Sequence, residues 1–141
     1  MQVYILKESN SDSRVAASPD TVKKMKDWGL NVVIQDNAGL NSNFSNEEYI
    51  KSGATISNEI TDISKSDLIL KINKPNEDEI ALMNEGSVLI ASLDPYNNSE
   101  TLNKLKDKGV TSFAMELMPR ITRAQSMDIL SSQSNLAGYK A

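Results

Sequence analysis

Polar side chains that can orient a planar ligand are concentrated near the end of this 141-residue chain, in residues 119–141. The stretch reads PRITRAQSMDILSSQSNLAGYKA, and its charged, amide and hydroxyl groups are Arg120, Arg123, Gln125, Asp128, Ser131, Ser132 and Asn135. An amide, a carboxylate and a hydroxyl at positions 125, 128 and 131 can both donate to and accept from a planar carboxamide edge. Arg120 adds a cation just before them. We interpret this segment as a candidate ligand-binding surface.

The same segment has the pattern of an amphipathic helix. Thr122 and Gln125 form a Thr-x-x-Gln capping box, which is typical of a helix start. At about 100° per residue, the polar residues from 125 to 135 share an arc of roughly 120°. We therefore predict a helix over 122–141 with an apolar face toward its own sheet. A second interpretation stays open: Gln125 only caps the helix, Asp128 only complements the helix dipole, and the serines only face solvent.

Composition excludes several kinds of chemistry. The chain has no cysteine and no histidine, so disulfides, thiolate chemistry and the commonest general base are absent. Its net charge of -4 is spread along the chain without a basic stripe, which argues against nucleic acid as a partner. We find no apolar run of about eighteen residues, the length that a membrane span needs. The first residues also lack the features of a signal peptide.

Short apolar runs rich in β-branched residues alternate with helical patterns along the chain. We predict strands over residues 3–6, 32–35, 68–72, 88–92 and 111–115. Ser18 and Pro19 begin a first helix that Gly29 ends. Further helices are expected over 45–53, 76–84 and 98–108, the first of them opened by a Ser45–Glu48 capping box.

This order predicts an α/β fold, a flavodoxin-like three-layer α/β/α domain with a mainly parallel five-stranded sheet. Sites in such sheets lie at the carboxyl ends of the strands. The residues expected there are Lys7, Glu8, Asn73, Lys74, Pro75, Asp94, Pro95 and 116–120. The edge of the sheet that carries these residues is therefore the place where we expect the site.

Residues 119–141 resemble the signature of the alpha subunit of proton-translocating NAD(P) transhydrogenase. Upstream segments agree in order: KES with SRVAASPDTV, then DNAGL, FSNEEYIKSGA, DLILKINKPNEDEIALMNEGSVLIASLDP and GVTSFAMELMPR. The resemblance therefore covers essentially the whole chain. The same framework, more loosely, is similar to alanine dehydrogenase.

The resemblance implies a two-domain subunit in which residues 1–141 form the N-terminal domain. This domain faces a Rossmann domain that binds NAD(H), and the nicotinamide lies in the cleft between the two. The subunit passes hydride from NADH to NADP+ on the beta subunit, and a membrane domain couples that transfer to proton translocation. A homodimer of alpha subunits, peripheral to the bacterial inner membrane through its partner subunits, is implied as well.

The resemblance also implies roles for single residues. Arg120, Gln125, Asp128 and Ser131 would face the nicotinamide, with Tyr139 close by. Arg120, Gln125 and Asp128 would orient the reacting ring and set its electrostatics, since hydride transfer itself belongs to the cofactors. No metal is implied.

Two further positions match alanine dehydrogenase. Arg14 and Lys71 correspond to the residues with which that enzyme holds its keto acid, although a lysine at a strand end can also be a simple snorkelling residue. Alanine dehydrogenase also uses a histidine in the region of Asp94, and this chain has none. The resemblance to transhydrogenase is therefore favoured over an alanine-dehydrogenase-like fragment.

The dinucleotide-binding motif G-x-G-x-x-G is absent, because no two of the six glycines lie two residues apart. We expect the chain to be a fragment whose final helix leads into a missing NAD-binding domain. Alone, it should bind NADH weakly or not at all and should transfer no hydride. The remaining alternative is a stand-alone flavodoxin-like binding or interaction module.

Overall fold

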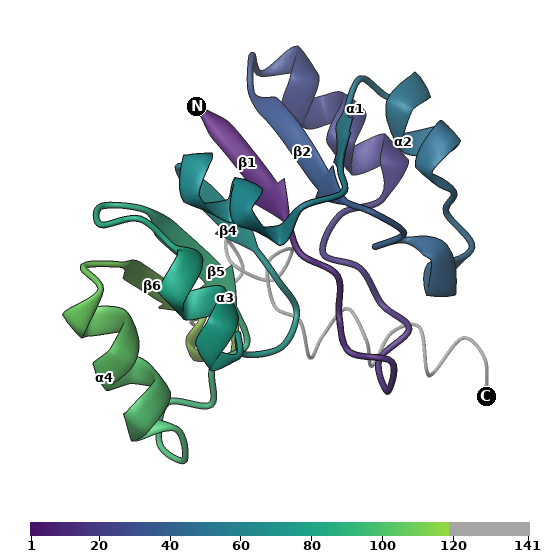
Figure 1. The fold of residues 1–141 in the computed structure, drawn as a ribbon. Coiled ribbons are helices and arrows are strands. Elements are labelled where there is room, and N and C mark those ends of the chain that lie inside the picture. Colours follow the sequence, from purple (N-terminus) through teal and green to yellow (C-terminus); the bar gives the residue numbers. More distant parts are fainter. Residues whose placement is uncertain (119–141) are drawn as a thin grey trace.

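The computed structural model describes residues 1–118, which form alternating strands and helices (Figure 1). The strands are β1 (Gln2–Ile5), β2 (Asn31–Gln35), β3 (Thr55–Ser57), β4 (Leu68–Leu70), β5 (Val88–Ala91) and β6 (Thr111–Ala114). The α-helices are α1 (Pro19–Asp27), α2 (Asn46–Lys51), α3 (Glu77–Leu82) and α4 (Ser99–Asp107). Three 3-10 helices are η1 (Leu40–Ser42), η2 (Ile60–Lys65) and η3 (Met115–Leu117).

All six strands run parallel in one sheet, in the order β3-β2-β1-β4-β5-β6. The predicted α/β class is confirmed, but the count of five strands is wrong. The five predicted strands keep the flavodoxin-like order, and β3 extends the sheet beyond β2. The complete order is the one seen in doubly wound dinucleotide-binding sheets.

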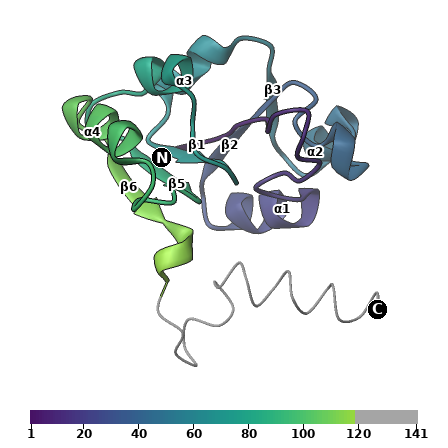
Figure 2. The same cartoon turned by 90° about the horizontal axis from the view of Figure 1, so that it is seen from below.

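Hydrophobic side chains on both faces of the sheet build two core clusters. Val3 and Ile5 of β1 face one cluster, which α1 and α2 cover through Val22 and Tyr49. Tyr4, between them, faces the opposite cluster, which η2, α3 and α4 cover. Figure 2 shows the resulting layers, with α1 on one side of the sheet and α3 and α4 on the other. This burial on both faces explains the nearly continuous apolar strands.

The helix starts follow the capping chemistry of the sequence. The Ser18 side chain accepts from the Thr21 N–H at the start of α1. Ser45 and Glu48 form the predicted capping box of α2, so that expectation is confirmed. Asn76 does the same with Glu79 at the start of α3.

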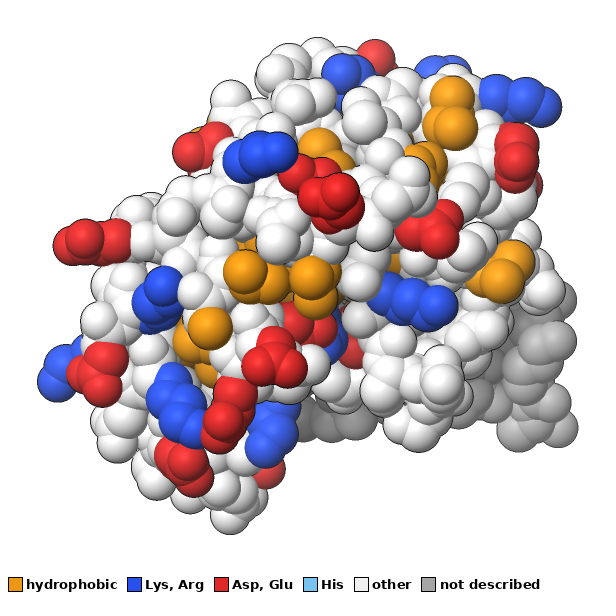
Figure 3. Space-filling model, viewed as in Figure 1, with side chains coloured by type: hydrophobic (Ala, Val, Ile, Leu, Met, Phe, Trp, Pro, Cys, Tyr) orange, Lys and Arg blue, Asp and Glu red, His pale blue; other side chains and the backbone are white. Residues whose placement is uncertain are grey.

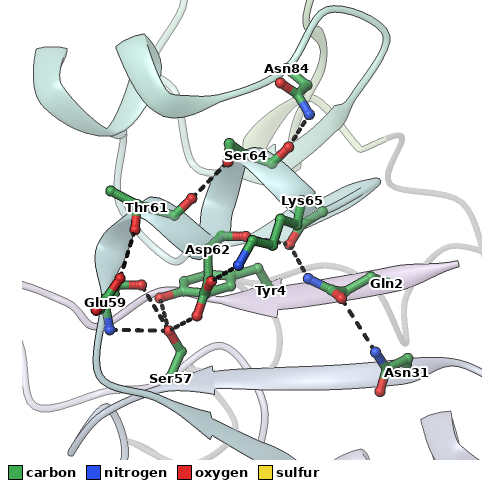
Figure 4. A network of polar contacts seen from close by, with 11 residues as sticks. Gln2, Tyr4, Asn31, Ser57, Glu59, Thr61, Asp62, Ser64, Lys65 and Asn84 are labelled. Carbon is green, nitrogen blue, oxygen red and sulfur yellow. Dashed lines mark hydrogen bonds and ion pairs between the residues drawn. The ribbon is translucent and has the colours of Figure 1, made fainter.

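The strand and 3-10 helix that were not predicted, β3 and η2, are held by a polar network rather than by a long apolar pattern (Figure 4). The buried Tyr4 hydroxyl donates to Ser57 Oγ at 3.4 Å, and Ser57 donates to the Asp62 carboxylate at 2.7 Å. Lys65 Nζ then lies 2.7 Å from the same carboxylate. Short range and polar composition hide such elements from a hydrophobic pattern.

Charged side chains of both signs are interspersed over the face that carries α3 and α4 (Figure 3). Lys104 of α4, for example, pairs with Glu100 of the same helix at 2.9 Å. Within residues 1–118, no helix is long and apolar enough to cross a membrane.

Candidate functional site

The order of the strands reverses at the centre of the sheet. From β1 the chain winds outward through β2 to β3, returns to β4 on the other side of β1, and continues to β6. In open α/β sheets, ligands bind outside the carboxyl ends of the strands at such a reversal. Here that place is the edge between the ends of β1 and β4, which we call the carboxyl edge together with the loops that follow β5 and β6.

Glu8 connects the loops after β1 and β4. Its carboxylate accepts from the main-chain N–H of Ile72 at 2.6 Å and of Asn73 at 3.2 Å. The Asn73 side-chain amide donates to it as well, at 3.0 Å. Glu8 is only 5% exposed, so these donors replace the water that a carboxylate otherwise binds. The carboxylate thus fixes the backbone on which the next residues of the site depend.

Asp12 and Arg14 form an ion pair in the loop after β1. Arg14 Nη2 lies 2.7 Å from the Asp12 carboxylate, and the Asn73 amide donates to the same carboxylate at 2.7 Å. The hydrogen bonds from Arg14 hold the pKa of Asp12 well below its usual range, against the opposing effect of burial. The Asp12 carboxylate in turn raises the pKa of Arg14. Both groups are therefore charged at neutral pH.

Lys71, the residue after β4, is paired inside the domain. Its Nζ lies 3.0 and 2.8 Å from the two carboxylate oxygens of Glu79, and both side chains are buried. The pair borders a cavity of about 420 Å³ that Lys7, Glu8 and Gln35 also line. The ammonium therefore already has a carboxylate partner where a keto acid would require it to be free.

Glu116, in η3, connects the exit of β6 to the loop after β5. Its carboxylate accepts from the N–H of Leu93 at 2.9 Å and of Asp94 at 2.7 Å. Asn98 donates from its side chain to the carbonyl oxygens of Leu93 and Asp94, and Lys74 donates to the Asn98 amide oxygen at 2.6 Å. The loops after β4, β5 and β6 are therefore joined side by side.

The described residues do not form a complete dinucleotide site. In a Rossmann domain, a glycine-rich turn after the first strand brings a helix N-terminus to the pyrophosphate. Here the connection from β1 to α1 runs from Leu6 to Ser18 and contains no glycine. Despite the strand order, residues 1–118 lack the elements that would hold the phosphates.

The candidate residues of the sequence fall into two groups. Arg14 and Lys71 do reach the carboxyl edge, each already paired with a carboxylate. Five others lie outside the described residues: Arg120, Gln125, Asp128, Ser131 and Tyr139.

Sequence reasoning missed the roles of several residues at the carboxyl edge, namely Asp12, Glu79, Asn98 and the hydrogen bonds of Glu8 and Glu116. The only signal for Glu8 and Glu116 was their position just after a strand. Nothing in the spacing indicated that their partners are main-chain N–H groups of other loops.

The sheet, its reversal point and the polar carboxyl edge define a doubly wound α/β domain with its candidate site at the strand ends. The family model described as alanine dehydrogenase/PNT, N-terminal domain, matches residues 4–137, and the chain belongs to this family.

Relatives with curated names agree. The first of the polypeptides that make up the NAD(P) transhydrogenase alpha subunit of Rhodospirillum rubrum is 42% identical over all of this chain and 38% of its own length. NAD(P) transhydrogenase subunit alpha of Haemophilus influenzae is 39% identical over 93% of this chain and 25% of its own length. Alanine dehydrogenase 1 of Staphylococcus aureus is 30% identical over all of this chain and 37% of its own length. The chain thus spans well under half the length of these relatives.

Solved structures give the same order of similarity. A transhydrogenase from Sinorhizobium meliloti superposes with a TM-score of 0.95 at 48% identity, covering all of this chain and 42% of that one. An L-alanine dehydrogenase gives a TM-score of 0.78 at 27% identity, over 82% of this chain and 32% of that one. Both kinds of relative are oxidoreductases by name.

Proposed function

We propose that this chain is the N-terminal domain of the NAD(H)-binding alpha subunit of a proton-translocating NAD(P) transhydrogenase. In this role it supplies the nicotinamide-facing wall of a cleft whose other wall is a Rossmann domain outside residues 1–141. The higher identity to transhydrogenase subunits than to alanine dehydrogenases supports the proposal. The proposed partners are that Rossmann domain, the NADP(H)-binding beta subunit and a second alpha subunit.

The observation that carries the proposal is the state of the two residues shared with alanine dehydrogenase. Arg14 is paired with Asp12, and Lys71 with the buried Glu79. A keto acid would have to displace both carboxylates, and the chain has no histidine to move a proton. The carboxyl edge is therefore suited to shaping a wall rather than to binding a small carboxylate substrate.

The remaining residues have positioning roles in this proposal. When bound, NAD(H) supplies the hydride that passes to NADP+ on the partner subunit. Gln125, Asp128 and Ser131 orient the carboxamide of the nicotinamide, with Tyr139 beside them. Arg120 presents a fixed positive charge to the same ring. Alignment of the two rings at close range is the main contribution that such side chains make to the rate.

The proposal is tested by NADH binding, followed by nicotinamide fluorescence, in the complete alpha subunit. We expect Gln125→Ala and Asp128→Asn each to raise the dissociation constant about tenfold, the value of roughly 1.4 kcal/mol of lost interaction. Gln133→Ala is the matched control, because position 133 lies outside the polar arc. The isolated 141-residue chain is expected to bind NADH weakly or not at all and to transfer no hydride.

Three outcomes contradict the proposal. A dissociation constant near one micromolar for the isolated chain would show a complete dinucleotide site in residues 1–141. Pyruvate binding that is lost in Arg14→Gln and Lys71→Met would instead support an alanine-dehydrogenase-like protein. Binding of neither ligand by the complete subunit would favour a non-catalytic interaction module.

A further inference from the structure

We propose that Glu116 is a positioning residue, which sets where the chain leaves β6 and thereby places Arg120 against the nicotinamide. The inference rests on the proposed function, because it assigns a cause to the placement of the nicotinamide-facing segment. Glu116 itself is not proposed to touch the cofactor.

The first argument is the hydrogen bonding of the Glu116 carboxylate. One oxygen accepts from both the Leu93 and Asp94 N–H groups, at 2.9 and 2.7 Å, and the other oxygen lies 3.2 Å from the Leu93 nitrogen. Hydrogen bonds to a charged acceptor are about twice as strong as neutral ones. The residue is exposed rather than buried in a core, so its place in the fold is set by these bonds and not by apolar packing. Such a side chain acts as a clamp between two loops.

The second argument is a repeated geometry at the carboxyl edge. Glu8, after β1, binds the N–H groups of the second and third residues after the neighbouring β4, Ile72 and Asn73. Glu116, after β6, binds the N–H groups of the second and third residues after the neighbouring β5. Both carboxylates therefore fix the point at which a neighbouring strand passes into its loop. The carboxyl edge is held on both sides of β4 and β5 by the same device.

The third argument is backbone strain in the clamped loop. Asp94 has φ +44°, in the left-handed region that residues other than glycine rarely adopt. Such a conformation persists only where the surroundings enforce it, and strained residues cluster at functional sites. Here the enforcing groups are Glu116, on the N–H of Asp94, and Asn98, on its carbonyl oxygen. The loop is therefore preorganised before any ligand binds.

These contacts lie directly before the segment that faces the nicotinamide in our proposal. Glu116 precedes Arg120 by four residues, with Pro119 between them. Proline fixes its own φ and restricts the residue before it, so a shift at position 116 is passed on rather than absorbed. Freeing the Glu116 carboxylate should therefore move the guanidinium of Arg120 relative to its ligand.

The experiment uses the complete alpha subunit and compares Glu116→Ala, Glu116→Gln and two controls. We expect Glu116→Ala to raise the KM for NADH about tenfold or more, because small displacements in a preorganised site have effects of this size. Glu116→Gln keeps one acceptor oxygen and should restore part of the loss. Hydrogen exchange at the Leu93 and Asp94 amides should accelerate in the order wild type, Gln, Ala.

The two controls separate positioning from charge and from stability. Glu100→Ala removes an exposed carboxylate of α4 that pairs with Lys104, and it should leave KM unchanged. Leu105→Val weakens the core under the same helix, and its KM should stay at the wild-type value at temperatures where the subunit is folded.

Each result decides one of the two proposals. Unchanged KM in Glu116→Ala, together with faster exchange at residues 93 and 94, would overturn the positioning role while leaving the proposed function intact. A KM that rises equally in Leu105→Val would also overturn it, because general destabilisation would then explain the effect. Failure of the wild-type subunit to bind NADH would instead overturn the proposed function.

Discussion

Lys71 and Glu79 form an ion pair of 2.8 Å in which the two side chains are only 8% and 6% exposed. Lys71 follows β4, and Glu79 is the third residue of α3, where its carboxylate also accepts from the Asn76 N–H at 2.9 Å. The pair therefore ties the end of a central strand to the start of the next helix. Charges this deeply buried are tolerated only when their partners are present.

Removal of one member of this pair should be strongly destabilising. We expect Lys71→Met to lower the free energy of unfolding by about 3 kcal/mol or more, because it leaves the Glu79 carboxylate buried without its cation. Urea denaturation of the 141-residue chain measures this difference. The double variant Lys71→Met/Glu79→Leu should recover most of the loss, since an apolar pair of similar volume replaces the charges. Additive losses in the double variant would contradict this account.

The Asp12–Arg14 pair should give stability a dependence on acidic pH. The pKa of Asp12 is lowered in the folded state by Arg14, from a usual value of 3.8. The contribution of Asp12 is therefore complete above that pH and disappears as the pH falls through the folded-state pKa. We expect Asp12→Asn to be less stable than wild type at pH 7, with the difference shrinking below about pH 4.

The cause of the shifted pKa can be checked in the native state by NMR titration of the Asp12 carboxyl carbon. Arg14→Gln removes the first cause of the shift and should raise the pKa of Asp12 toward its usual value. An unchanged titration in this variant would show that Arg14 does not determine it.

The contrast between predicted and missed features has a physical origin. Val3 and Ile5 are recognisable from local pattern because both are apolar and β-branched, and Ser45 with Glu48 is recognisable because a capping box has fixed spacing. The strand Thr55–Ser57 is three residues long and partly polar, so no periodicity marks it.

The carboxyl edge illustrates the same limit at the site. The position of Glu8 after a strand was predictable, because parallel strands all end at one edge of the sheet. Its partners were not, since Ile72 and Asn73 are more than sixty residues away and become neighbours only when β1 pairs with β4. Ion pairs such as Lys71–Glu79 likewise depend on how a helix returns over the sheet.

Gly39 should resist substitution because of its contact with a buried tyrosine. A Cβ atom at this position would lie 2.6 Å from Tyr49 Cε2 and 2.7 Å from the Tyr49 hydroxyl oxygen. We expect Gly39→Ala to lower the free energy of unfolding by about 1–3 kcal/mol, the usual cost of overpacking. Thermal or urea denaturation measures the loss.

Gly29 provides the matched control for this substitution. Its φ of +85° disfavours alanine, but a Cβ there would meet no atom within 4 Å. Gly29→Ala should therefore cost about 1–2 kcal/mol through backbone strain alone. It should leave the environment of Tyr49 unchanged, whereas Gly39→Ala should disturb it. Equal tyrosine spectra for the two variants would show that Gly39 is not required by the aromatic ring.

Tyr49 should be one of the last tyrosines to ionise when the pH is raised. Burial, with a smaller contribution from the Glu48 carboxylate, raises the pKa of Tyr49 from 10.0 to about 12. The stability that this shift represents is complete below pH 10 and is lost as the pH rises through the folded-state value. Ultraviolet absorbance of tyrosinate, followed from about pH 9 upward, measures the transition.

Two single substitutions assign that transition. Tyr49→Phe should remove one late step, and it should cost about 1 kcal/mol because the Ala17 carbonyl loses the hydroxyl that donates to it at 2.8 Å. Tyr96→Phe removes an 86%-exposed hydroxyl and should leave the late steps in place. Burial also raises the pKa of Tyr4, so one late step remains in Tyr49→Phe. Loss of both late steps there would mean that the two tyrosines, on opposite faces of the sheet, ionise only when the domain unfolds.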